Sequence, residues 1–166
     1  MSKISPIIKW VAITLIVVAA FATGMWMTHR FYQKTEVKAE EESQVLMEKI
    51  KTVGDAYMCA GGLPEENETN PIDTVSAAIE MRNFLTTRRT AKLAEGKDYW
   101  DMRIGVHTGR VVAGVVGSKK FAYDIWGDTV NTASRMETSG AGGKVNISQT
   151  TYELVKDHFD CEYRGT

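Results

Sequence analysis

The sequence has few cysteines and no excess of charge of either sign. Its 166 residues include only 2 cysteines, Cys59 and Cys161, which form neither a CxxC pair nor a disulfide framework. This argues against a small secreted domain held together by disulfides and favours a reducing compartment. Lys and Arg number 20 against 21 Asp and Glu. Nucleic-acid-binding domains usually carry a basic excess, so we expect no nucleic-acid partner.

One stretch lacks charge altogether. Trp10–Trp26 contains no charged residue, and with its neighbours it reaches the roughly 20 residues that cross a bilayer as a helix. Tryptophan at both ends fits the membrane interfaces. An alternative is a secretory signal peptide, with Lys3 and Lys9 as its basic start and cleavage after Ala22. We predict a membrane anchor over residues 1–30.

Residues 31–47 lack glycine and proline and are polar and charged. Their apolar residues are too sparse for a coiled-coil repeat. We predict a helical linker there, and a solvated helix without a signalling role fits the pattern equally well.

The rest of the chain alternates between strand and helix patterns. Ile50–Leu63 predicts a β-hairpin around a Gly54-Asp55 turn. An apolar stripe then predicts a helix over 72–89, and alternating residues predict a second hairpin from strands at 102–107 and 111–116. A further strand is expected at 144–147, followed by a helix that Ser148 or Thr150 caps and that runs to about His158. This order predicts an α+β fold with a mainly antiparallel sheet and flanking helices.

The most informative stretch is Phe121–Glu137, FAYDIWGDTVNTASRME. A short apolar strand precedes Asp128, which we expect to cap a helix that starts at the next residue. We expect this helix to end near Ser139–Gly140, where glycine would let the chain leave in a left-handed conformation. Asn131 and Arg135 are four residues apart and share a helix face. Together with Asp124 they suit an anionic, hydrogen-bonding ligand. An ordinary solvated helix face would show the same spacing.

This stretch resembles the signature of the class III nucleotide cyclases, the adenylate and guanylate cyclase catalytic domain. Two others agree in order and separation, EKIKTVGDAYMCAGGLP at 48–64 and MRIGVHTGRVVAGVVG at 102–117. The resemblance implies a partial cyclase catalytic domain over 48–166. Its ferredoxin-like fold would be incomplete at both ends and preceded by one transmembrane helix.

Members of this family convert a nucleoside triphosphate into a 3′,5′-cyclic monophosphate and pyrophosphate. The resemblance implies two metal ions, Mg²⁺ or Mn²⁺, in a site between two catalytic domains, and hence a homodimer or heterodimer. By resemblance, Asp55 is one of two metal-binding aspartates. Arg110 matches an arginine that reaches the triphosphate from the metal-binding side.

The base-reading positions favour ATP. Lys51 and Asp124 match the pair that recognises the adenine edge, where guanylate cyclases place Glu and usually Cys. Asn131 matches the residue that positions the ribose, and Arg135 the arginine that stabilises charge on the α-phosphate.

Two family features have no counterpart in this sequence. In the family, a strand before the hairpin carries the first metal aspartate, but no aspartate precedes Asp55 here. The family's C-terminal strands, with a phosphate-binding lysine, are also missing. With the membrane segment in the place of the first strand, we expect an uncovered sheet edge and little activity from this chain alone.

Our first hypothesis is therefore a single-pass membrane adenylate cyclase that acts in signal transduction, with its catalytic domain in the cytoplasm, where ATP is available. The alternative is a non-catalytic or truncated cyclase-like module that pairs with a complete cyclase. A guanylate cyclase and a secreted binding domain are less favoured.

Overall fold

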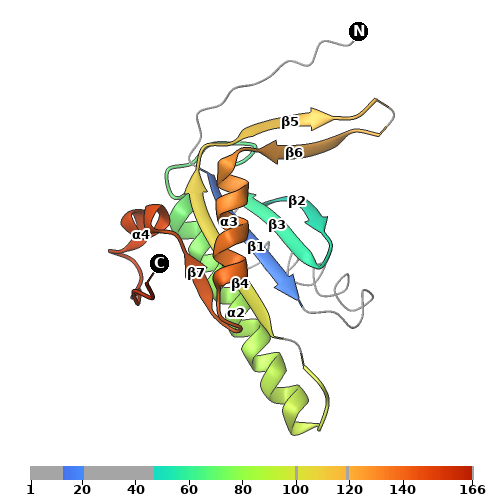
Figure 1. The fold of residues 1–166 in the computed structure, drawn as a ribbon, viewed down its shortest axis with the longest axis vertical. Coiled ribbons are helices and arrows are strands. Elements are labelled where there is room, and N and C mark those ends of the chain that lie inside the picture. The colour runs from blue at the N-terminus through green and yellow to red at the C-terminus, as the bar shows by residue number, and fades with distance from the viewer. Residues whose placement is uncertain (1–12, 21–46, 100, 119, 166) are drawn as a thin grey trace.

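The computed structural model describes residues 13–20, 47–99, 101–118 and 120–165. These residues form a five-stranded sheet, a two-stranded ribbon and three helices (Figure 1). The sheet has the order β2-β3-β1-β4-β7, and its only parallel neighbours are β4 and β7. In chain order the elements are β1 (Ile13–Ala20), β2 (Met47–Val53), β3 (Ala56–Gly61), α2 (Asn70–Ala94), β4 (Met102–Gly109), β5 (Val112–Val116), β6 (Ala122–Trp126), α3 (Asp128–Ser139), β7 (Val145–Ile147) and α4 (Gln149–Val155).

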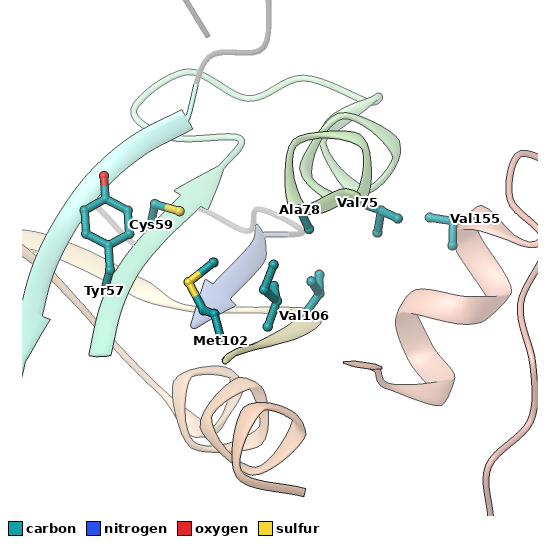
Figure 2. Close-up of a cluster of buried hydrophobic side chains, with 8 residues drawn as sticks. Tyr57, Cys59, Val75, Ala78, Met102, Val106 and Val155 are labelled. Atoms are coloured by element: carbon teal, nitrogen blue, oxygen red, sulfur yellow. The ribbon is translucent and has the colours of Figure 1, made fainter. Parts of the chain in front are cut away.

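Helices cover both faces of the sheet. On one face, α2 and α4 pack over a buried cluster made of Tyr57, Cys59, Val75, Ala78, Met102, Ile104, Val106 and Val155 (Figure 2). On the other face, α3 and the β5–β6 ribbon pack over Ile50, Met58, Ala60, Leu63, Val111, Ile125 and Ala133. We call these faces the α2 face and the α3 face. The two clusters explain why residues 57–61 of β3 are all buried, since each face of the strand has its own cover.

α3 can approach β4 closely because Gly105 has no side chain. A Cβ atom at this position would lie 2.1 Å from the backbone nitrogen of Glu137 and 2.6 Å from the carbonyl oxygen of Ala133. Any other residue would push the helix off the strand. This glycine therefore sets the distance between α3 and the sheet.

The structure corrects the prediction for the uncharged N-terminal stretch. Residues 13–20, expected within a transmembrane helix, form β1, which pairs with β3 on one side and β4 on the other. A strand buried in the middle of a sheet has the same continuous apolar sequence as a membrane segment, and Ile13–Ala20 is rich in β-branched residues. The uncovered sheet edge that we expected there is filled by β1.

No helix in the described part of the chain is both long and apolar enough to cross a bilayer. The predicted linker over 31–47 and the remainder of the predicted anchor lie almost wholly outside the described residues, with only Met47 belonging to β2.

The α+β prediction is otherwise confirmed, with one change in pairing. The first hairpin forms as β2 and β3 around Gly54, whose φ of 61° suits the two-residue turn. The expected second hairpin does not form, because β4 lies in the large sheet while β5 pairs with β6 in the separate ribbon. In Figure 1 this ribbon projects from the rest of the domain.

Candidate functional site

Lys51 and Asp124 form an ion pair between the hairpin and the ribbon. The Lys51 Nζ atom donates to Asp124 Oδ2 at 2.8 Å, although the two residues are 73 positions apart. The other carboxylate oxygen, Oδ1, accepts from the backbone N–H of Ile125 at 2.8 Å. The Lys51 side chain is 40% exposed and that of Asp124 17%, so the carboxylate is held in place while the ammonium remains accessible. The pair presents a donor and an acceptor side by side, as recognition of a heterocycle edge requires.

α3 begins one residue earlier than predicted. Gly127 is the N-cap, with φ 140° and no side-chain capping bond, and Asp128 lies in the first turn. Asp128 therefore stabilises the positive helix end by its charge and not as the cap. The helix ends before Gly140 as expected, but Gly140 has φ −69° and ψ 157°, so the chain leaves in an extended and not a left-handed conformation.

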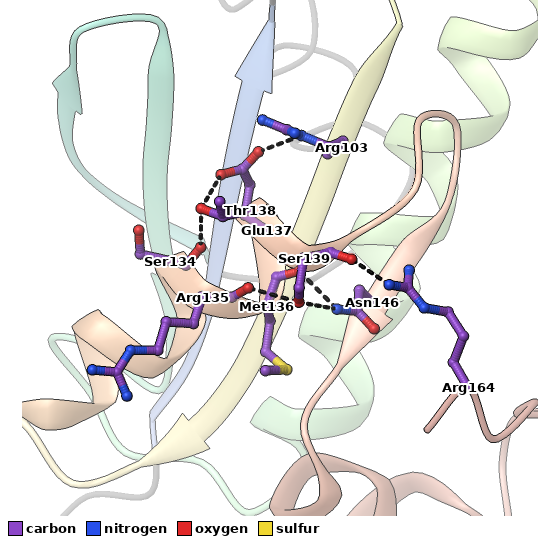
Figure 3. Close-up of polar contacts among 9 residues, drawn as sticks. All are labelled: Arg103, Ser134, Arg135, Met136, Glu137, Thr138, Ser139, Asn146 and Arg164. Carbon is purple, nitrogen blue, oxygen red and sulfur yellow. Dashed lines mark hydrogen bonds and ion pairs between the residues drawn. The ribbon is translucent and has the colours of Figure 1, made fainter. Parts of the chain in front are cut away.

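Asn131 and Arg135 lie in the middle of α3 and are both accessible to solvent. Neither side chain has a hydrogen-bond or ion-pair partner among the residues that the structure describes. Figure 3 shows the Arg135 guanidinium pointing away from the polar contacts at the end of the helix. These side chains are therefore available to a ligand or a second chain.

Arg110 is connected to the start of α3 through its backbone. The Thr129 hydroxyl donates to the Arg110 carbonyl oxygen at 2.5 Å, and Thr129 is itself buried. Gly127 also permits this contact, since a Cβ atom there would lie 3.3 Å from the same carbonyl oxygen. The connection between β4 and β5 is thus fixed to the helix that carries Asn131 and Arg135.

Asp55 lies exposed in the β2–β3 turn. The register places Ala19, at the end of β1, opposite Ala56, the residue after Asp55. β1 therefore ends beside the position where a second carboxylate would be needed, but its sequence ITLIVVAA carries no acid. In the described part of the chain, no group of three or more His, Cys, Asp or Glu residues could hold a metal ion. These residues do not fit a two-metal site within one chain.

Polar contacts hold the C-terminal end of α3 (Figure 3). The buried Glu137 accepts from Arg103 Nε at 2.8 Å, which ties the helix to β4. Asn146 Nδ2, from β7, donates to the Met136 carbonyl oxygen at 2.7 Å. Arg164 donates to the Ser139 carbonyl oxygen. Carbonyl groups without a partner inside the helix are thereby satisfied.

Two side chains near these elements have shifted pKa values. Burial lowers the pKa of His107 below its usual value, and the charge of Asp128 opposes part of this effect. His107 Nδ1 lies 2.7 Å from the hydroxyl of Ser148, the N-cap of α4. Burial raises the pKa of Tyr123, which precedes Asp124, and the negative charge of Glu48 adds to the shift. The polar surroundings of His107 fit a structural role.

Comparison with known proteins decides the family. Residues 25–166 match the family model of the adenylate and guanylate cyclase catalytic domain. The chain belongs to this family. β1 precedes the matched residues, so the strand at the centre of the sheet lies outside the family match.

Individual relatives of this cyclase domain include both activities. It is 42% identical over 124 residues to the receptor-type guanylate cyclase gcy-28 of Caenorhabditis elegans, covering 71% of this chain and 9% of that protein. It is 40% identical over 120 residues to an adenylate cyclase of Mycobacterium bovis, covering 72% and 26%. The domain thus spans about a quarter or less of the length of these relatives.

Among solved structures, it resembles the catalytic core of a rhodopsin-guanylyl cyclase with converted specificity in complex with ATPαS. The TM-score is 0.78 at 28% identity, with 96% of this chain and 88% of that chain covered. This agrees with the predicted cyclase fold.

The cyclase domain brings together some of the residues singled out in the sequence. Lys51 meets Asp124, and Arg110 is joined to the start of α3. Asp55 has no hydrogen-bond or ion-pair partner in the described part of the chain. Sequence reasoning missed Thr129 and the Glu137–Arg103 pair. A buried threonine at the first turn of a helix gives no signal that its partner lies 19 residues earlier.

Proposed function

We propose that this cyclase domain uses ATP, and that Lys51 and Asp124 read the adenine edge. The observation that carries the proposal is the 2.8 Å contact between Lys51 Nζ and Asp124 Oδ2. Adenine offers a ring acceptor and an amino donor next to each other, whereas guanine offers a carbonyl acceptor and a protonated ring nitrogen. Lysine can only donate and an ionised aspartate can only accept, so the pair complements adenine and mismatches guanine.

In the proposed reaction the oxygen of the ribose 3′ hydroxyl bonds to the α-phosphorus, the bond from the α-phosphorus to the oxygen that bridges to the β-phosphate breaks, and pyrophosphate leaves while the hydroxyl proton passes to solvent. Asn131 would hold the ribose, and Arg135 would neutralise charge that develops on the α-phosphate. Arg110 would contact the triphosphate of a second site across the dimer. The family uses divalent metal ions for this chemistry, and Asp55 alone does not complete a site for them in this chain.

A dimer is part of this proposal because a cyclase site is expected between two domains. Its support is the exposed apolar surface of the β5–β6 ribbon, with Val112 47%, Val115 57% and Trp126 41% exposed. Exposed apolar groups of this kind mark contact surfaces between proteins. Sedimentation of the purified protein at increasing concentration should show a monomer–dimer equilibrium, and a monomer at all concentrations would contradict this part.

The base assignment is tested by changing both readers together. The double variant Lys51→Glu with Asp124→Cys should shift the ratio of cyclic AMP to cyclic GMP formation toward cyclic GMP by about tenfold or more. The assay mixes the chain with a cyclase domain that supplies both metal aspartates but has lost its own base-reading lysine. Lys49→Glu is the matched control, because Lys49 faces away from Asp124 and should leave the ratio unchanged. An unchanged ratio in the double variant would refute adenine reading.

A second candidate is a domain that contributes only to a partner's site. It is favoured by the acid-free strand β1 beside Asp55. Alone, with Mg²⁺ or Mn²⁺ and ATP, this chain should then turn over well below about 1 per second, and the mixture should be much faster. Equal specific activity with and without the partner would contradict this candidate.

Location at a membrane, with a cytoplasmic domain, remains a further proposal. Its support is the length of the uncharged run Trp10–Trp26. β1 lies within this run, so one molecule can form either β1 or a membrane helix there, but not both. Alkaline carbonate extraction separates the two: an anchored protein stays in the membrane pellet, and a protein that forms β1 is released.

A further inference from the structure

The strand that carries Lys51 contains an extra residue. Met47, Glu48 and Lys49 lie opposite Gly61, Ala60 and Cys59, and then Lys51, Thr52 and Val53 lie opposite Met58, Tyr57 and Ala56. Ile50 is left without a partner in β3. This is a β-bulge, in which two residues of one strand face a single residue of the other.

The bulge sends two lysines to opposite faces of the sheet. Lys49 lies opposite Cys59, which belongs to the α2 face, and its ammonium is 5.7 Å from the centroid of the Tyr57 ring of the same cluster. Lys51 lies opposite Met58, which belongs to the α3 face, and bonds to Asp124. In a regular strand, residues two apart share a face, so the sequence alone predicts that both lysines point the same way.

Ile50 connects the bulge to the other member of the ion pair. Ile50 is 9% exposed and Ile125 is 2% exposed, and both belong to the cluster on the α3 face. The backbone N–H of Ile125 donates to Asp124. Lys51 therefore directly follows one buried isoleucine of this cluster, and Asp124 directly precedes the other.

We propose that the bulge at Ile50 is a specificity-determining element of the base site, because its local bend and added twist aim Lys51 at Asp124. Bulges bend a strand and increase its twist, and they re-aim side chains next to active sites. This inference rests on the proposed reading of adenine by Lys51. It adds that the backbone of β2, and not only the identity of residue 51, selects the base.

Deletion of Ile50 tests the proposal because it removes the bulge without changing the face of Lys51. In the regular ladder that results, Lys51 still lies opposite Met58 and Lys49 opposite Cys59. If only the face of the strand on which Lys51 lies mattered, the deletion would therefore leave ATP binding unchanged. The proposal predicts that ATP binding weakens by about tenfold while GTP binding stays the same, as measured by titration calorimetry.

Ile50→Ala is the matched control, since it keeps the extra backbone residue and removes only the buried side chain. ATP binding should stay within about threefold of the unaltered protein, an effect smaller than one lost hydrogen bond. If Ile50→Ala weakens ATP binding as much as the deletion does, packing and not the bulge aims Lys51, and the proposal is wrong. Unchanged ATP binding in the deletion variant would overturn it as well.

A second readout does not need nucleotide. In the unaltered background, the shifts in urea midpoint caused by Lys51→Met and Asp124→Asn should not add, because the two side chains interact. In the deletion background the two shifts should add. If the unaltered protein binds no ATP, the proposed function fails, and this comparison still decides whether the bulge creates the ion pair. Non-additive shifts in both backgrounds would overturn the bulge proposal.

A third comparison covers a deletion variant that does not fold. Lys51→Met and Lys49→Met leave the backbone intact and remove the same charge two residues apart. Only Lys51→Met should weaken ATP binding by about tenfold. Equal losses from both substitutions would show that the bulge does not separate the two lysines.

Discussion

The C-terminal end of α3 and its middle are built differently. Towards its C-terminus, Glu137, Ser139 and the Met136 carbonyl group are all bonded to neighbouring elements (Figure 3). Earlier in the same helix, the side chains of Asn131 and Arg135 have no hydrogen-bond or ion-pair partner in the described part of the chain. The C-terminal end of the helix is fixed by polar contacts, while its middle presents polar groups to a ligand or a partner chain. A rigid element of this kind positions ligand-binding side chains more accurately than a loop does.

The contrast also has an electrostatic side. The amino end of a helix carries a partial positive charge that attracts anions, and the Arg110 backbone is tied to this end by Thr129. Asp128, in the first turn, adds a negative charge there. An anionic ligand must therefore be held mainly by the arginines, and not by the helix end alone.

The largest expected effect comes from removing the Arg103–Glu137 ion pair at the C-terminal end of α3. Arg103→Met should lower the free energy of unfolding by about 3 kcal/mol, because it leaves the Glu137 carboxylate buried without its cation. Urea denaturation measures the loss. The double variant Arg103→Met with Glu137→Met should recover much of the stability. A loss below about 1 kcal/mol in the single variant would show that the pair behaves like a surface ion pair.

Arg135→Ala should lower the activity and leave the stability unchanged. In the mixture with a metal-competent partner it should reduce turnover about 100-fold, as loss of a group that stabilises developing charge does, for ATP and GTP alike. The urea midpoint should not change, because the Arg135 guanidinium makes no hydrogen bond or ion pair with a described residue, and the bond from the Ser139 hydroxyl to the Arg135 carbonyl oxygen does not depend on the side chain. A large fall in stability without a fall in turnover would mean that the middle of α3 and its C-terminal end are not as different as their contacts indicate.

A milder change at the fixed end is Asn146→Ala. It removes the 2.7 Å bond to the Met136 carbonyl oxygen and should cost about 1 kcal/mol in the free energy of unfolding. Base preference should stay the same. A changed ratio of ATP to GTP use would show that the end of the helix affects the base site.

The smallest effect concerns His107, whose pKa is lowered by burial. The folded protein binds this proton less tightly than the unfolded chain does, so the free energy of unfolding should fall as the pH drops below about 6.5. Above this pH the contribution is complete. His107→Asn, which keeps a hydrogen-bonding group near Ser148, should flatten the pH dependence, as followed by urea denaturation between pH 5 and 8. An equal slope in both proteins would assign the dependence to another group.

Short sequence patterns predicted the turns and element boundaries that depend only on neighbouring residues. The Gly54-Asp55 turn and the strand-to-helix change around Gly127 both depend on the backbone freedom of glycine next to apolar runs. The apolar stretch at 13–20 was misread because a central strand and a membrane helix can both be continuous apolar runs. The pairing of β5 with β6, and not with β4, depends on long-range packing that periodicity does not record.

In the candidate site, too, the contacts that depend on long-range packing could not be predicted from short sequence patterns. The meeting of Lys51 and Asp124 was expected only from the resemblance to the cyclases, since 73 residues separate them. The bulge at Ile50 could not be predicted, because the spacing of Lys49 and Lys51 fits an unbroken strand. The contact between Thr129 and Arg110 depends on how two turns pack against each other, which no short motif encodes.

The central position of β1 also bears on how this protein folds. β1 is synthesised before both of its partners, β3 at residues 56–61 and β4 at residues 102–109. During translation β1 stays unpaired until β3 and β4 have both left the ribosome. Pairings that are distant in sequence slow folding, and an unpaired apolar strand is prone to aggregation meanwhile. A chaperone that binds extended apolar segments would therefore find a target in Ile13–Ala20.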